Sequence, residues 1–430
     1  MPSHPNFSQS HKKGAENLGL LEPAIAIIVS LGFLIALLYK RVNLGITLNV
    51  TALLLALLAL DWAAIPLIIW QTTTDPLAIS VVLATFGIML LSQLYKETSI
   101  INKLSESIGN LIKNPKIVLS VLPAVIGLLP VAGGALMSAP LVDIEAEKLK
   151  LKPDRKAYVN IWFRHTVFPV YPLSPPIITT AALTGVAIPL IILRQIPVVL
   201  VMIIIGFIIG FWKVPKYKNE EKTNEEETVN SNFKTFLITF SPILATIIVA
   251  ISMDSVGVAL EGFHTVIAIL VGLLILIVIS KLNFTVFKKP FKSWGIYGIT
   301  AAAYGAFLLR KIMMTPEISN VFSTFVTNGG GTTSILLLIA IPAILGVLTG
   351  SPVSGVAISI PILCGTSLVA PSVAALIYIS AYLGYTIAPT HLCFTFTADY
   401  FKCTLGKVYK YVIPSFIVTF PMALLIYFLI

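Results

Sequence analysis

Apolar runs of about 20 residues recur along this 430-residue chain, and that length spans a bilayer core about 30 Å thick. The runs predict ten membrane-crossing helices, five in each half of the chain. We place the crossings at residues 20–39, 44–70, 76–95, 157–184, 188–212, 233–253, 263–283, 293–312, 371–400 and 407–430. A polar tail, residues 1–18, precedes the first run.

An additional apolar stretch lies between the third and fourth crossings of each half. These stretches cover residues 116–147 and 333–369, and Pro and Gly residues interrupt both of them midway. Such interruptions leave unpaired backbone groups, which are tolerated only inside protein or around a water-filled cavity. Each stretch is therefore predicted to be a re-entrant hairpin, which enters and leaves the membrane on the same side.

The two halves of the chain repeat short sequences at a nearly constant spacing. PAVIGLL at Pro123 returns as PAILGVL at Pro342, 219 residues later, and TVFP at Thr166 returns as TIAP at Thr386, 220 residues later. Because each half has five crossings, the second half enters the membrane from the opposite side. The predicted fold is an all-α polytopic membrane protein built from two inverted repeats with discontinuous helices. The first repeat covers residues 19–212, and the second covers residues 233–430. A charged and flexible linker, residues 213–232, joins them.

Composition and charge support a membrane protein and predict its orientation. Hydrophobic residues make up 57% of the chain, only 11% of residues are charged, and the mean hydropathy is +0.94. The net charge of +10 does not indicate a nucleic-acid partner, because the basic residues lie in short loops between the apolar runs. With both termini outside and both hairpins re-entrant, 23 of the 29 Lys and Arg residues face the cytoplasm, as the positive-inside rule requires. The predicted location is the cytoplasmic membrane, with the lipid bilayer as a partner.

The turns of the two hairpins combine glycine with hydroxyl residues. Glycine lets another group approach the backbone closely. Hydroxyl and backbone oxygens at membrane depth could bind a small cation, hydrogen-bond a polar solute, or cap their own helices. The sequence leaves these alternatives open. The turn residues concerned are Gly133, Gly134 and Ser138 in the first hairpin, and Thr349, Gly350, Ser351 and Ser354 in the second.

Proline interrupts the fourth crossing of each half. In the first half, four prolines fall within the eight residues from Pro169 to Pro176, around Tyr171 and Ser174, and an α-helix cannot continue through them. In the second half, the residues Ala388-Pro389-Thr390-His391 form the break. Each break frees carbonyls at one half-helix end, which suit Na⁺ or a proton donor, and N–H groups at the other, which suit an anion.

Ionisable residues flank the two breaks unequally. Arg164 and His165 precede the first break, where the second has Gly384-Tyr385, and His391 follows the second break. Arg164 either snorkels to the interface or offers a bidentate counter-charge to a carboxylate. Each histidine is either structural or a protonation site for H⁺ coupling. Two broken helices, each beside a hairpin, predict a substrate site near the membrane midplane.

Four stretches resemble the ion transporter superfamily of secondary carriers, and most closely a prokaryotic integral-membrane family that carries only an unknown-function label. They are GLLPVAGGALMSAPLVD at 127–143, WFRHTVFPVYP at 162–172, LGVLTGSPVSGVAISIP at 345–361 and GYTIAPTHLCFTFTADYFK at 384–402. The resemblance implies two inverted repeats whose hairpins and breaks form a mobile transport domain. It also implies a scaffold that is often dimeric, so a homodimer is expected.

The resemblance carries the superfamily's binding positions onto the same hairpin turns and onto the two breaks, Pro169 to Pro172 and Ala388 to His391. Dicarboxylate carriers of the superfamily have Ser-Asn-Thr at both hairpin tips, and this chain departs from that pattern because neither tip has Asn. A coupling Na⁺ would be expected near Thr349, Ser351 and Ala388.

The predicted function is secondary active transport of a small organic anion of the carboxylate type, coupled to H⁺ or Na⁺, by alternating access. A channel or facilitator shares the same parts and remains an alternative. A membrane-embedded enzyme is a further alternative, although the sequence holds no HExxH metal motif and no nucleophile–base constellation. No enzymatic activity, cofactor or resident metal is therefore expected. We interpret the three cysteines, Cys364, Cys393 and Cys403, as packing residues.

Overall fold

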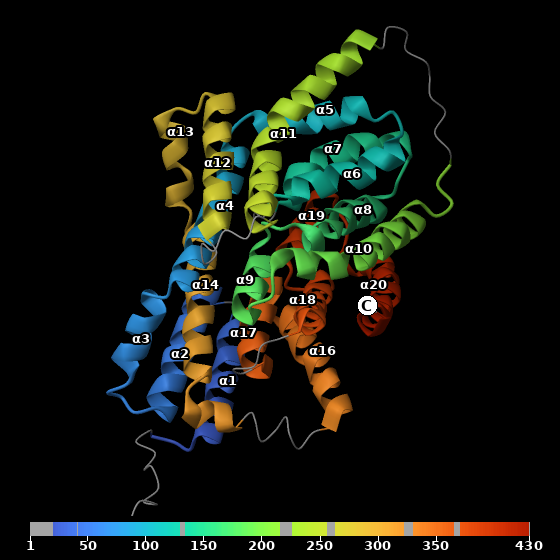
Figure 1. The fold of residues 1–430 in the computed structure, drawn as a ribbon. Helices are drawn as coiled ribbons and strands as arrows, with labels where there is room; N and C mark the ends of the chain where they lie inside the picture. The colour runs from blue at the N-terminus through green and yellow to red at the C-terminus, as the bar shows by residue number, and fades with distance from the viewer. Residues whose placement is uncertain are drawn as a thin grey trace, which may run out of the picture.

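A computed structural model describes most of the chain as a bundle of helices (Figure 1). The described residues are 20–40, 42–129, 134–215, 226–255, 263–321, 330–364 and 370–429. Within these ranges there are 19 α-helices and no strands, which confirms the all-α prediction.

Five helices precede the first hairpin, and proline or Asp starts several of them. Pro23 and Pro76 occupy the first turns of α1 and α4, where a missing N–H costs nothing. The Asp75 carboxylate caps α4 by accepting from the backbone N–H of Leu77 at 2.9 Å. The five helices are α1 (Pro23–Tyr39), α2 (Leu44–Ala59), α3 (Ile65–Thr73), α4 (Pro76–Glu97) and α5 (Ile100–Leu111).

Two features of this region differ from the prediction. The crossing predicted at 44–70 is not continuous, because the chain leaves the helix between α2 and α3. Asp61 stabilises the turn there by accepting from the N–H of Ala63 at 3.0 Å, and Pro66 favours a new helix start. Helix α5 was not predicted at all, because its alternating polar residues do not form a long apolar run.

Separate shorter helices occupy the residues of the predicted first hairpin and of the predicted first broken helix, and the re-entry of the hairpin stays a prediction. The hairpin arms α6 and α7 have 13 and 14 residues, or about 20 Å at 1.5 Å per residue. Each arm is therefore shorter than a bilayer core of about 30 Å. These helices are α6 (Pro115–Gly127), α7 (Ala135–Lys148), α8 (Pro153–Thr166), the 3₁₀ turn η1 (Phe168–Val170), α9 (Pro175–Thr184) and α10 (Ile188–Phe211).

The second half follows the same order of elements. Helix α11 begins at Glu226, so the last part of the linker predicted at 213–232 is helical rather than flexible. The helices are α11 (Glu226–Ser255), α12 (Phe263–Ser280), α13 (Phe284–Lys288), the 3₁₀ turn η2 (Pro290–Lys292), α14 (Trp294–Met313), α16 (Gly330–Thr349), α17 (Pro352–Cys364), α18 (Pro371–Thr386), α19 (Leu392–Tyr400) and α20 (Leu405–Leu429).

Five helices of the described residues are long and apolar enough to cross a membrane, judged by length and composition. They cover Pro76–Glu97, Ile188–Phe211, Asn232–Met253, Phe263–Ser280 and Leu405–Leu429. These helices fit a protein embedded in a membrane. The count of ten crossings, the inversion of the repeats and the orientation of the termini stay predictions.

Two apolar clusters form the core, and the first break lies between them. One cluster draws on α5, α6, α7, α8, α11 and α12, which lie at the upper end of the molecule in Figure 1. The other draws on α1, α2, α9, α14 and α17, towards the lower end. Because α8 belongs to the first cluster and α9 to the second, the chain passes between them at the break.

The repeated sequences encode the same helix contact in both halves. Helix α6 packs on α8, and α16 packs on α18. A Cβ placed on Gly127 would lie 2.5 Å from the Arg164 carbonyl oxygen, and one on Gly346 would overlap the Ala381 carbonyl. These glycines occupy matching places in PAVIGLL and PAILGVL. The repeat therefore specifies a close approach between each hairpin and its broken helix.

Candidate functional site

The first break is closed by local hydrogen bonds and by tyrosines from the other half of the chain. Short backbone bonds such as Ser174 N–H to the Tyr171 carbonyl, at 3.0 Å, turn the chain between η1 and α9. Tyr382 of α18 donates its hydroxyl to the His165 carbonyl at 2.5 Å, and Tyr378 donates to the Phe168 carbonyl at 3.1 Å. Carbonyls freed at a helix end need such partners. Two carbonyls that the sequence analysis offered to a cation are therefore already paired.

The second break contacts the tip of the second hairpin directly. Gly350 has a φ of +60°, a left-handed conformation that favours glycine. A Cβ there would lie 2.9 Å from the Thr390 carbonyl carbon and 3.0 Å from the His391 nitrogen. Thr390 also donates its hydroxyl to the Val347 carbonyl at 3.3 Å. The predicted meeting of a hairpin tip with a helix break is thus present in the second half.

A cavity of about 220 Å³ lies where both breaks and the second hairpin tip come together. An apolar cavity of about 150 Å³ is large enough to hold benzene, so this one has room for a small organic molecule. The first turns of α9, α17 and α19 all line it. Its described polar and ionisable lining includes Arg164, His165, Tyr382, Tyr385, His391 and Cys393.

Arg164 is the fixed positive charge of this cavity. Its side chain is only 1% exposed, so it does not snorkel to an interface. Nη2 donates to the Leu129 carbonyl at 3.0 Å, whereas Nη1 has no hydrogen-bond partner among the described residues. Burying an unpaired charged donor is costly. Among the described residues, Nη1 is therefore a buried charged donor that remains without a partner.

The two histidines lie side by side in the cavity but differ in their hydrogen bonds. Their ring centroids are 4.7 Å apart. His165 has a partner at each ring nitrogen, the Ile161 carbonyl at 2.6 Å and the Tyr385 hydroxyl at 3.1 Å. His391 is 2% exposed, and neither of its ring nitrogens has a hydrogen-bond partner among the described residues. Two buried polar atoms of His391 are thus available to a ligand.

The contact between His165 and Tyr385 joins matching positions of the two halves. The residues are 220 apart, the same spacing as the repeated TVFP and TIAP sequences. Thr166 and Thr386, each the last residue of its helix, both donate a hydroxyl to the carbonyl three residues earlier. The two breaks therefore face each other at the cavity with equivalent residues in contact.

The donor atoms of His165, His391 and Cys393 lie within 4.8 Å of one another. Imidazole and thiolate together are the donors of many zinc and copper sites. The Arg164 guanidinium lines the same cavity and interacts electrostatically with Cys393 and His391. A divalent cation would be repelled by this charge, and the described lining residues include no carboxylate to offset it. We therefore assign no metal to this cluster.

The hydroxyls of the second hairpin tip mainly cap their own helices. Thr349 donates to the Leu345 carbonyl at 2.7 Å and accepts from the Ser351 N–H at 3.2 Å. The Ser351 hydroxyl accepts from the N–H of Ser354 at 3.4 Å. Ser351 also lines the cavity together with Gly350. The capping alternative from the sequence is thus present, and the expected Na⁺ position near Thr349, Ser351 and Ala388 stays a prediction.

Several other predicted site residues do not belong to the described lining of the cavity. Ser138 donates to the Asn160 side chain at 2.6 Å, and Asn160 donates to the Ala135 carbonyl at 2.8 Å, which fastens α7 to α8. Gly134 starts α7 with a φ of −59°, so its freedom to adopt positive φ is not used. Gly133 lies outside the described residues. Buried residues of the breaks and of the second tip that also do not line the cavity are Pro169, Tyr171, Ser174, Ser354 and Ala388.

Sequence reasoning missed part of the cavity wall. Tyr382 was not considered, and Cys393, interpreted as a packing residue, lines the cavity. Tyr385 was noted only as the counterpart of the Arg164-His165 pair. The tyrosines at positions 378, 382 and 385 recur at helical spacing. That spacing places their hydroxyls on one face of α18 and could have predicted a polar face there.

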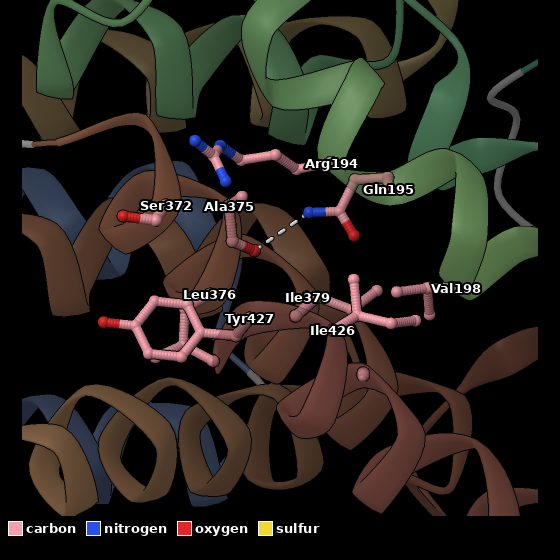
Figure 2. A pocket seen from close by; sticks show the side chains of 10 residues that line it. Arg194, Gln195, Val198, Ser372, Ala375, Leu376, Ile379, Ile426 and Tyr427 are labelled. Carbon is pink, nitrogen blue, oxygen red and sulfur yellow. Dashed lines mark hydrogen bonds between the residues drawn. The ribbon is translucent and has the colours of Figure 1, made fainter. Parts of the chain in front are cut away.

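A second cavity, between α10, α18 and α20, is much smaller (Figure 2). Gln195 donates there to the Ala375 carbonyl at 2.9 Å, which joins the two halves of the chain. Its volume of about 20 Å³ is enough for roughly one water molecule. This cavity is therefore a packing feature and not a substrate site.

Comparison with known proteins supports the resemblance seen in the sequence only at the level of a family. A search of functionally described proteins found no match. Residues 24–430 match the family described as "Protein of unknown function (DUF401)". Because the match covers nearly the whole chain, the protein belongs to this family.

Proposed function

We propose that the protein is a secondary active transporter of a small organic anion that carries a carboxylate group. The substrate would occupy the cavity between the two breaks and the second hairpin tip. The protein would then be a member of the ion transporter superfamily, with inverted repeats and with the breaks near the membrane midplane. Substrate sites at paired helix breaks are a general feature of such carriers.

The observation that carries the proposal is the buried guanidinium of Arg164, whose Nη1 has no hydrogen-bond partner among the described residues although the group also interacts with Cys393. A carboxylate is the natural partner, because arginine presents its donors in a planar fork that matches two carboxylate oxygens. Among the described residues that line the cavity, none has an acidic side chain that could take this role. An anion from outside the chain therefore completes the charge balance.

The helix ends around the cavity favour the same sign of ligand charge. The amino-terminal turns of α9, α17 and α19 all line it, and each such end carries about half a positive elementary charge. The first turns of α9 and α17 contain Pro175, Pro176 and Pro352, which have no N–H to donate. The dipoles of these two helices would therefore attract an anion mainly by long-range electrostatics and not by hydrogen bonds from these prolines. Helix α19 begins without proline and has backbone N–H groups at its first turn.

Transport can be tested with the full-length protein in liposomes and a panel of radiolabelled L-lactate, succinate and citrate. We expect one class of carboxylate to accumulate above the level in protein-free liposomes under a pH or Na⁺ gradient. Arg164→Gln should lower affinity by about 10- to 100-fold, because a hydrogen bond to a charged group contributes about 1.5–3 kcal/mol. Arg164→Lys keeps the charge but loses the fork, so its loss should be smaller.

Arg194→Gln is the matched control, because Arg194 lies near the amino-terminal end of α10 and lines the small cavity instead. It should transport like the wild type. No accumulation of any panel member, or unchanged transport in Arg164→Gln, would contradict the proposal. Flux that ignores both gradients would indicate a channel or facilitator.

A further inference from the structure

We infer that His391 is the proton-carrying residue, and that the protein moves one proton together with each carboxylate. This inference rests on the proposed function and names its coupling ion. It follows from three observations about the cavity: its charge, the unpaired ring of His391, and the distance between that ring and the other titratable groups.

The charge of the cavity is set by very few groups. Helix α8 contributes Arg164 and His165, α18 contributes Tyr382 and Tyr385, and α19 with its preceding residue contributes His391 and Cys393. The lining residues of α4, α9, α14 and the second hairpin tip contain no ionisable side chain. With neutral histidines, the described residues that line the cavity therefore have a net charge of +1, which comes from Arg164.

His165 is already satisfied as a neutral ring. Because the Ile161 carbonyl can only accept, Nδ1 carries the hydrogen and donates to it over 2.6 Å. Nε2 is then free to accept from the Tyr385 hydroxyl at 3.1 Å. A proton on Nε2 would force this hydrogen bond to reverse. His165 therefore positions Tyr385 and keeps its own ring fixed.

His391 has the opposite requirement. Both its nitrogens are buried without a hydrogen-bond partner among the described residues, and its ring packs on Tyr385 with centroids 4.0 Å apart. A protonated ring would offer two donors to a carboxylate in the cavity. In the empty cavity the same proton would sit near the Arg164 charge, with which His391 interacts electrostatically. Repulsion between such charges is strong where water is excluded.

Anion and proton should therefore bind together. The carboxylate lowers the repulsion that opposes protonation of His391, and by linkage the proton raises carboxylate affinity by the same factor. For a monocarboxylate, the loaded cavity regains the net charge of +1 that the empty cavity has. The empty and the loaded carrier would then have the same net charge in the cavity. The change from outward-facing to inward-facing would therefore move the same charge in both, and cotransport of a monocarboxylate with one proton would be electroneutral.

The arrangement also gives a reason for H⁺ rather than Na⁺. The carbonyls of His165 and Phe168 at the first break are paired with tyrosine hydroxyls, and Tyr409 donates to the Ile387 carbonyl at the second break at 3.0 Å. Sodium needs several oxygen ligands, and each of these three carbonyls already uses one of its two lone pairs to accept a hydrogen bond. A proton needs only one free nitrogen, which His391 provides.

The experiment measures proton uptake by the full-length protein in nanodiscs, in weak buffer with a pH indicator. L-lactate, succinate and citrate are added separately, with and without Na⁺. The wild type should take up about one proton for each bound anion, without a need for Na⁺. Between the pKa of His391 in the anion-free protein and its pKa in the anion-bound protein, affinity should fall about tenfold for each pH unit, as linkage to one proton requires.

Three histidine variants separate the roles. His391→Gln should still bind the anion at high concentration but should take up no proton and show a flat pH profile. His165→Gln loses the bond to Tyr385 and should weaken anion binding, but it should still take up one proton for each anion that binds. His264→Gln, at a histidine of α12 away from this cavity, should match the wild type. Size-exclusion profiles and melting temperatures without ligand check that the variants are folded.

The outcomes distinguish a failure of the transporter proposal from a failure of the proton-coupling inference. If no panel member binds to the wild type, the proposed function fails and the inference falls with it. If an anion binds without proton uptake, if uptake survives in His391→Gln, or if binding requires Na⁺, the inference fails while the transporter proposal stands.

Discussion

Replacing Gly350 with alanine should loosen the contact between the second hairpin tip and the second break. The φ of +60° at Gly350 would cost an alanine about 1–2 kcal/mol. Its Cβ would also lie 2.9 Å from the Thr390 carbonyl carbon and 3.0 Å from the His391 nitrogen. These are backbone atoms and cannot rotate away, so the tip must shift. Overpacking of this kind adds about 1–3 kcal/mol.

Gly185→Ala is the matched control for this substitution. Gly185 ends α9 with a φ of +73°, and a Cβ placed there would meet nothing within 4 Å. Both variants therefore carry the same backbone strain, and only Gly350→Ala carries the clash. Melting curves of the detergent-solubilised protein and carboxylate binding in nanodiscs provide the comparison.

Gly350→Ala should melt at a lower temperature than Gly185→Ala and bind the anion more weakly, because His391 and Ser351 move. Gly185→Ala should bind like the wild type. Equal stability and equal binding in the two variants would refute the close contact between tip and break.

Two further substitutions test the supports of the site. Tyr382→Phe leaves the His165 carbonyl at the end of α8 without its 2.5 Å hydrogen bond and should lower the free energy of unfolding by about 1–3 kcal/mol. Tyr304→Phe loses an exposed hydrogen bond to Thr73 and should change the melting temperature little. Similar shifts of the melting temperature in both variants would contradict the capping role of Tyr382. Lys156→Met removes a buried ammonium that forms ion pairs with Asp143 at 2.7 Å and with Glu147. Because both carboxylates are partly exposed, the free energy of unfolding should fall by about 1–2 kcal/mol, which is less than the loss of a fully buried pair would cost. Lys148→Met, which breaks the exposed pair with Glu145, should cost under about 1 kcal/mol, and an equal loss in both lysine variants would refute the burial argument.

The positions of the breaks were predictable because proline acts locally. Four prolines between Pro169 and Pro176 exclude a continuous helix whatever the tertiary structure, and the structure indeed ends α8 at Thr166 and starts α9 at Pro175. The glycines of the repeated sequences were likewise informative. The break at Asp61 was missed because a single polar residue in an apolar run gives a weak signal.

The contacts that complete the site were not predictable from local pattern. Tyr378 and Tyr382 reach carbonyls more than 200 residues earlier in the chain, and no periodicity records such a pairing. The burial of Arg164 depends on how α6 packs against α8. The alternatives for Arg164 and for the hairpin hydroxyls therefore needed the three-dimensional arrangement to be decided.

A structure determined with the transported carboxylate bound would test the central claim most directly. We predict density for the carboxylate in the 220 Å³ cavity, with one oxygen within hydrogen-bond distance of Arg164 Nη1 and the other near the His391 ring. Carboxylate density elsewhere in the molecule, with Arg164 Nη1 bonded instead to groups of the chain itself, would contradict the claim.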